Sequence, residues 1–170
     1  MITSMISYET EEYLRTTSSH DLILLIQQEE EKMSISARNQ LAGKIESIQE
    51  GAVNSIVTLK LDCGTKVSST ISKEAVADLG LTSGKAATAV IKATEVMIGI
   101  GELKISARNQ IAGEIAAVTE GVVNATVTFK TDGGNTLTAT ISLAAVKELR
   151  LAVGVKAKAI VKSTSVMLAV

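Results

Sequence analysis

The strongest constraint on the fold is an internal repeat. Residues 35–100 align without a gap on residues 105–170, at a constant offset of 70, and 32 of the 66 aligned pairs are identical. Identity at this level indicates duplication of a whole folding unit. Two units are too few for a solenoid, so each copy is expected to be a small closed domain. We expect a first domain at residues 34–100, a linker at 101–104 and a second domain at 105–170.

Within each copy the hydrophobic pattern has the period of a β-strand. Apolar and polar residues alternate, with many β-branched residues, over 42–48, 53–61, 66–71, 85–91 and 94–98. The segments 62–64 (Asp-Cys-Gly) and 132–134 (Asp-Gly-Gly) lie between alternating runs and predict hairpins. A short helix is expected near 72–79, with Ser72 as its N-cap and Gly80 at its end, and again near 142–149. These elements predict an all-β protein with two tandem OB-like five-stranded barrels, each with one short helix.

Residues 1–33 have no counterpart in either copy. They carry two basic and seven acidic residues, a net charge of −5, whereas residues 34–170 carry 15 basic and 11 acidic residues, a net charge of +4. One interpretation of this extension is a helix over residues 8–31. The other is a non-native or poorly ordered segment, because Glu29–Lys32 is encoded wholly by purines, as a ribosome-binding site would be, directly before Met33. Under that hypothesis the chain purified from its own host has the mass of a protein that begins at Met33.

Composition excludes several classes of function. Only one cysteine, Cys63, and one histidine, His20, are present, so a zinc site made of several such residues is excluded, and a lone cysteine suits a reducing, cytoplasmic compartment. No unbroken apolar run is longer than Leu22–Ile26, which is too short to cross a membrane. No carboxylate pair, nucleophile–base pair or metal-ligand cluster recurs in both copies. We therefore expect a protein that is not an enzyme and binds no metal cation.

The polar residues that both copies keep are the candidates for function. Ser36–Gln40 recurs unchanged as Ser106–Gln110, and the other retained pairs are Lys92 and Lys162, Ser72 and Ser142, Thr70 and Thr140, and Asn54 and Asn124. One interpretation is structural: Arg38 and Asn39 would bond to backbone carbonyls, and the two Ser residues would be simple helix caps. The other is an oxyanion site, because Arg, Lys, hydroxyl and backbone N–H groups are the donors that a deprotonated tetrahedral anion requires.

Three motifs, in the same order in both copies, resemble the Mop (molbindin) family. They are Ser-Ala-Arg-Asn-Gln, Gly-Ala-Val-Asn54 and Val-Ile-Lys-Ala-Thr-Glu-Val-Met97, with Gly-Val-Val-Asn124 and Ile-Val-Lys-Ser-Thr-Ser-Val-Met167 in the second copy. The resemblance covers residues 33–170. It implies a cytoplasmic di-Mop protein that binds molybdate or tungstate for storage or homeostasis. It also implies OB-like domains that assemble as a homotrimer, with anion sites between subunits or domains.

Carried over by motif, the resemblance implies site residues in both copies. The first copy would supply Ser36, Ala37 and Arg38 from one segment, with Lys92, Ala93 and Ser72 from a facing domain; the second would supply Ser106, Ala107, Arg108, Ser142, Lys162 and Ser163. Asn54 and Asn124 resemble residues near additional anion sites. Two departures stand out: Ala75 and Ala145 replace a frequent hydroxyl residue, and Ala93 lacks the hydroxyl of Ser163. The two sites are therefore expected to differ in affinity.

Other functions remain as alternatives. A nucleic-acid-binding OB protein needs exposed aromatic residues, but the repeated body has only Phe129, which alternation places in the core. A molybdate-responsive regulator would need a helix-turn-helix domain, for which the segment 1–33, with its net charge of −5, is too short. A transporter ATPase would need a phosphate-binding Gly-x-x-x-x-Gly-Lys-Ser/Thr loop, which is absent from the sequence. A pterin ligand is disfavoured by the lack of stacking residues.

Overall fold

The computed structural model of this chain describes residues 35–102 and 104–170. The chain divides into two units, residues 1–36 and 37–170, and the second unit contains both repeats from Ala37 onward. The helix proposed over residues 8–31 and the proposed start at Met33 lie outside the described residues. No helix in the described part of the chain is both long and apolar enough to cross a membrane.

The two repeats form the same elements in the same order. The first contains β1 (Asn39–Glu50), β2 (Asn54–Leu61), β3 (Lys66–Ser72), α3 (Lys73–Asp78), β4 (Ala86–Ile91), the 3₁₀ turn η1 (Ala93–Glu95) and β5 (Met97–Gly99). The second contains β6 (Asn109–Glu120), β7 (Asn124–Thr131), β8 (Thr136–Ser142), α4 (Leu143–Glu148), β9 (Lys156–Val161), η2 (Ser163–Ser165) and β10 (Met167–Ala169). The predicted class is confirmed: each half is a five-stranded antiparallel half-barrel with one short helix.

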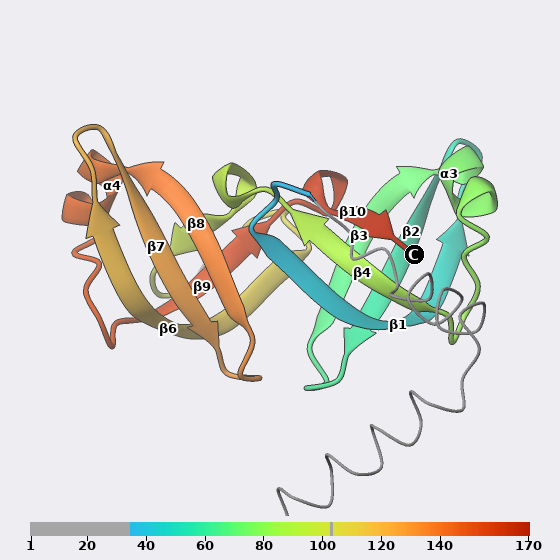
Figure 1. The fold of residues 1–170 in the computed structure, drawn as a ribbon, viewed down its shortest axis with the longest axis horizontal. Coiled ribbons are helices and arrows are strands. Elements are labelled where there is room, and N and C mark those ends of the chain that lie inside the picture. Colours follow the sequence, from blue (N-terminus) through green and yellow to red (C-terminus); the bar gives the residue numbers. More distant parts are fainter. Residues whose placement is uncertain (1–34, 103) are drawn as a thin grey trace, which may run out of the picture. The chain divides into compact units, whose positions relative to one another are not determined.

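The last strand of each repeat is exchanged between the two sheets. One sheet has the order β10-β4-β1-β2-β3 and the other β5-β9-β6-β7-β8, and Figure 1 shows β10 (red) beside β4 of the first repeat. Met167 pairs with Val90, and Met97 with Ile160. The expectation of two separately closed domains is therefore wrong. Alternation could not show this, because β4 and β9 offer the same backbone donors and acceptors to a strand from either copy.

The ends of the predicted elements are largely as expected. Ser72 caps α3, since its Oγ accepts a hydrogen bond from the Ala75 N–H at 3.1 Å, and Gly80 after this helix has φ +55°. Arg150 holds the equivalent position after α4 with φ +50°, a conformation that costs a residue with a Cβ roughly 1–2 kcal/mol. The strand expected at 94–98 is wrong in its first half, because residues 93–95 form η1.

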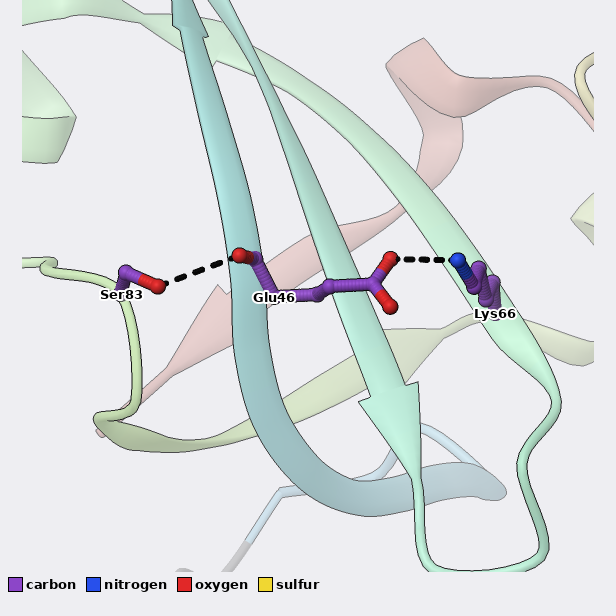
Figure 2. A network of polar contacts seen from close by, with 3 residues as sticks. All are labelled: Glu46, Lys66 and Ser83. Atoms are coloured by element: carbon purple, nitrogen blue, oxygen red, sulfur yellow. Dashed lines mark hydrogen bonds and ion pairs between the residues drawn. The ribbon is translucent and has the colours of Figure 1, made fainter.

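A β-bulge bends β1, and the backbone at the bulge is hydrogen-bonded to the turn before β4. The register of β1 against β2 shifts between Ile45 and Ser47, which frees the backbone of Glu46 from the ladder. Figure 2 shows the consequence: Ser83 Oγ donates to the Glu46 carbonyl at 3.1 Å, and the Glu46 carboxylate reaches Lys66 Nζ at 2.7 Å. The second repeat has the same register shift, between Ile115 and Ala117. Because both partners of this ion pair are partly exposed, the bulge rather than the pair accounts for the bend.

A continuous aliphatic core packs inside the half-barrels. The largest fully buried side chains include Phe129, Ile45, Leu59, Ile91, Ile115 and Leu137. Phe129 is the sole aromatic residue among the described residues and is 0% exposed, as alternation predicted. Base stacking on an exposed aromatic ring is thus unavailable on the described surface.

Two buried asparagines connect the repeats through backbone groups. The Asn39 side chain, 1% exposed, accepts from the Thr138 N–H at 2.6 Å and donates to the Thr138 and Ile91 carbonyls at 2.9 and 3.2 Å. Asn109 bonds in the same way to the N–H and carbonyl of Ser68, at 2.7 and 2.9 Å. Each side-chain amide therefore forms, with a strand of the other repeat, the pair of hydrogen bonds that the backbone of a neighbouring strand would otherwise form. The structural interpretation of Asn39 is confirmed.

Replacing Asn39 with Ala should destabilise the protein by roughly 2–4 kcal/mol, because three backbone groups lose their partner. Asn109→Ala should cost less, since Asn109 holds two such groups. Urea unfolding of the full chain measures both changes. An Asn39→Ala midpoint equal to that of the unmodified protein would show that these bonds contribute no stability.

Ser55 and Ser69 form a matched pair for a second test, because both are 0% exposed and both are Ala in the second repeat. Ser55 Oγ has no hydrogen-bond partner among the described residues, whereas Ser69 Oγ donates to the Val166 carbonyl at 2.5 Å. We predict that Ser55→Ala stabilises the protein by about 1 kcal/mol and that Ser69→Ala destabilises it by about 1 kcal/mol. Shifts of the same sign in urea unfolding would contradict this assignment.

Candidate functional site

Strand register places an arginine and a lysine at one end of each sheet, and both repeats retain this pair of positive charges. Asn39 pairs with Ile91 at the end of the antiparallel β1–β4 ladder. Arg38 comes just before β1 and Lys92 just after β4, so the two residues are adjacent at this end. Asn109 pairs with Val161 in the same way, which places Arg108 beside Lys162. Within this chain, Lys92 therefore lies beside Arg38 of the same repeat, and the prediction that it also faces an Arg38 segment of another domain or subunit stays a prediction.

These four cations are exposed and are not neutralised by the described part of the protein. Arg38, Lys92, Arg108 and Lys162 are all exposed, and none takes part in the ion pairs found among the described residues. A bound anion would interact favourably with both positive charges of such a pair. No hydrogen bond from Arg38 to a backbone carbonyl occurs among the described residues, so its structural interpretation gains no support.

The two 3₁₀ turns cross over to the edge strand of the opposite repeat. Turn η2 packs on β3, and η1 packs on β8. Thr70 Oγ1 and Ser163 Oγ are 2.8 Å apart across the first of these contacts. Ser72 lies two residues beyond Thr70 and so on the same face of β3. Lys162 and Ser163 are thereby grouped with Ser72, whereas Lys92 and Ala93 are grouped with Ser142.

Within this chain, the crossed grouping differs from the arrangement that the family resemblance implies. Lys92, Ala93 and Ser72 were expected on one facing domain, but Ser72 and the Lys92 turn belong to different groups. The physical reason is the strand exchange, which carries each turn over to the other repeat before its last strand pairs. Each candidate site thus combines residues of both copies.

Ser72 and Ser142 are helix caps that keep a donor for a ligand. Each Oγ accepts from a backbone N–H three residues ahead, at 3.1 Å from Ala75 and from Ala145. Both Ser residues are exposed. Because a hydroxyl accepts and donates at once, each retains its own proton for an anion. The cap interpretation is confirmed, and it leaves the binding interpretation open.

The other predicted site residues are the serine and alanine that directly precede Arg38 and Arg108 in the sequence. Ala37 and Ala107 are buried, with their carbonyls bound by Gln40 and Gln110 Nε2 at 3.2 Å. Ser106 is exposed, and so is Ser36, which belongs to the N-terminal unit.

Asn54 and Asn124 lie opposite the capping serines. Asn54 pairs in register with Ser72, and Asn124 with Ser142. A hollow of about 320 Å³ beside Ser72 is lined by Ala52, Val53, Ser72, Lys73 and Glu74. Leu143 and Ala144 replace Lys73 and Glu74 in the second repeat. The hollow's charged lining is therefore peculiar to the first copy.

Two other polar features lie away from the predicted residues. A hollow of about 260 Å³ is lined in part by Lys156 and Lys158. The equivalent residues in the first repeat are Ala86 and Thr88. Lys156 Nζ donates a hydrogen bond to the Glu114 carboxylate at 3.1 Å, and this bond raises the pKa of Lys156. Cys63 is exposed, and hydrogen bonding to Thr65 and Asn135 lowers its thiol pKa. Neither feature is shared by the two copies.

Thr70 forms a contact between the repeats that was not predicted from the sequence. Its retention as Thr140 was visible, but its partner Ser163 is 93 residues away in sequence and belongs to the other copy. Alternation places Thr70 on the same face as Ser72, and this was the available signal.

Comparison with known proteins gives the relationships of the two repeats. A model of the TOBE domain matches residues 35–98 and 105–168. The molybdenum transport protein ModE of Azotobacter vinelandii is 39% identical over 139 residues, which cover 81% of this chain and 52% of ModE. A probable molybdenum-pterin-binding protein of Haemophilus influenzae is 56% identical over 68 residues, 40% of this chain and 99% of that protein.

A solved structure is similar over most of the chain. The cytoplasmic molybdate-binding protein ModG, crystallised with molybdate bound, superposes with a TM-score of 0.79 at 37% identity, covering 81% of this chain and 99% of ModG. This chain spans about half the length of the ModE relatives that it matches. The homologues are molybdate-binding and transport-associated proteins rather than enzymes. With both repeats matched, the chain belongs to the TOBE-domain family and carries two tandem TOBE (Mop) domains.

Proposed function

We propose that this protein binds molybdate, and tungstate in the same way, as an oxyanion rather than as a metal cation. The observation that carries the proposal is the adjacency of Arg38 with Lys92 and of Arg108 with Lys162, without a carboxylate paired to them among the described residues. The description of ModG as a molybdate-binding protein, at 37% identity, supports the same ligand.

The proposed ligand set consists of donors. Charge-assisted bonds would come from the Arg and Lys side chains, and further bonds from Ser hydroxyls and backbone N–H groups. A fully deprotonated tetrahedral dianion suits such a set, because it needs no acceptor. The proposed residues are Ser36, Ala37, Arg38, Ser72, Lys92, Ala93, Ser106, Ala107, Arg108, Ser142, Lys162 and Ser163, with Asn54 and Asn124 at an additional site.

We further propose that three chains assemble as a homotrimer and that residues of neighbouring subunits complete the anion sites. The loops next to the capping serines expose large apolar side chains: Val53 is 72% exposed, Val122 96% and Val123 70%. Clustered apolar residues at the rim of a polar site are typical of an interface. A cytoplasmic role in storage or homeostasis is proposed by similarity to ModG, which is described as cytoplasmic.

Calorimetric titration with molybdate tests the proposed site. Arg38→Ala should weaken binding by roughly tenfold, since a hydrogen bond to a charged group contributes about 1.5–3 kcal/mol and Arg38 is exposed. Lys60→Ala is the matched control, because it removes one exposed positive charge from β2, away from the site. It should leave the affinity unchanged.

Sulfate provides the test of selectivity, because it has the same charge and shape but is smaller. It should bind more weakly than molybdate to the unmodified chain. The proposal fails if the unmodified protein does not bind molybdate. Equal loss of affinity in Arg38→Ala and Lys60→Ala would instead indicate a general electrostatic effect and would remove Arg38 from the site.

A further inference from the structure

The two candidate anion sites are built from equivalent positions, but their hydroxyl groups differ. Where η2 packs on β3, Thr70 Oγ1 and Ser163 Oγ share a hydrogen bond of 2.8 Å in a partly buried position. Where η1 packs on β8, the equivalent residues are Thr140 and Ala93, so only one hydroxyl is present. The difference arises next to Lys162 and Lys92, which are candidate ligands.

The hydroxyl pair supplies a directed donor. Two hydroxyls that share one hydrogen bond use one proton between them and keep the other. When Ser163 donates to an anion, its oxygen can accept from Thr70, and such a chain of bonds strengthens the outer donor. The Thr140–Ala93 contact offers no equivalent chain, because Ala93 has no oxygen on its side chain.

The η2 turn is also held more firmly to its strand. Ser69 Oγ donates to the Val166 carbonyl at 2.5 Å, just beyond the end of η2. The equivalent residue on β8 is Ala139, which cannot make this bond to Val96. Two side-chain bonds thus fix η2, whereas η1 has neither of them. A preorganised turn loses less conformational entropy when a ligand binds.

The carboxylate between the turns does not reverse this difference. Glu95 on η1 accepts from Ser165 Oγ on η2 at 2.7 Å, so its charge lies where the two turns meet. Glu95 and Ser165 occupy equivalent positions of the two copies. The hydroxyl pair and the Ser69 bond are the differences in hydrogen bonding at the two turns, whereas Glu95 and the Lys73–Glu74 lining are differences in charge.

We infer that the two sites are unequal, with the Lys162–Ser163 site binding a tetrahedral oxyanion first and Thr70 acting as its positioning residue. This inference rests on the proposed function. It assigns Ser163 as the ligand that sets the difference, and Thr70 as a residue that acts through Ser163 without touching the anion.

Titration of the full chain with molybdate should resolve a tight and a weak class of sites. Ser163→Ala should weaken the tight class by roughly tenfold and leave the weak class unchanged, because it removes one donor to a charged ligand. Ala93→Ser adds the missing hydroxyl and should tighten the weak class. Binding in a single class in the unmodified protein would overturn the inference while leaving the proposed function intact; absence of any binding would overturn both.

Thr70 is tested against its own equivalent in the second repeat. Thr70→Val should weaken only the tight class, by roughly threefold, since it removes the bond that orients Ser163. Thr70→Ser should restore the affinity, and Thr140→Val, the matched control, should change neither class. An equal effect of Thr70→Val and Thr140→Val, or loss of both classes in Thr70→Val, would show that Thr70 acts on stability alone and would refute the positioning role.

Discussion

The exchange of the last strand between repeats is the constraint on which the rest of the structure depends. Each five-stranded sheet takes four strands from one copy and its edge strand from the other. Neither copy can complete its hydrogen-bond ladder alone. The buried amides of Asn39 and Asn109 reinforce this dependence, because each satisfies backbone groups of a strand in the opposite repeat.

The same exchange decides how the candidate site is assembled. Between β4 and β5, and again between β9 and β10, the chain crosses to the other repeat. The 3₁₀ turn in this connection packs on the edge strand of that repeat. A lysine precedes each turn, and a capping serine ends each edge strand. Donors from both copies therefore meet in pairs. Because both copies lie in one chain, equivalent positions are free to diverge, as Ser163 and Ala93 have done.

Much of the fold could be predicted from local patterns. The hairpins at Gly64 and Gly134, the caps at Ser72 and Ser142, and the burial of Phe129 all follow from short-range chemistry. The segment at 94–98 was harder, because its alternation is as compatible with a 3₁₀ turn followed by three strand residues as with one strand. Most of the candidate site residues were recognised by their retention in both copies, but their grouping within the chain was not predicted.

By itself, the sequence determined the number of units, the class of fold and the chemistry that the shared polar residues can perform. These depend on composition, on alternation and on identity between two segments of one chain. Only the tertiary structure decided which copy completes each sheet, and hence that Ser72 is grouped with Ser163 rather than with Lys92. The physical reason is that backbone hydrogen bonds carry no label for the copy that supplies them, so partner choice depends on the path of the whole chain.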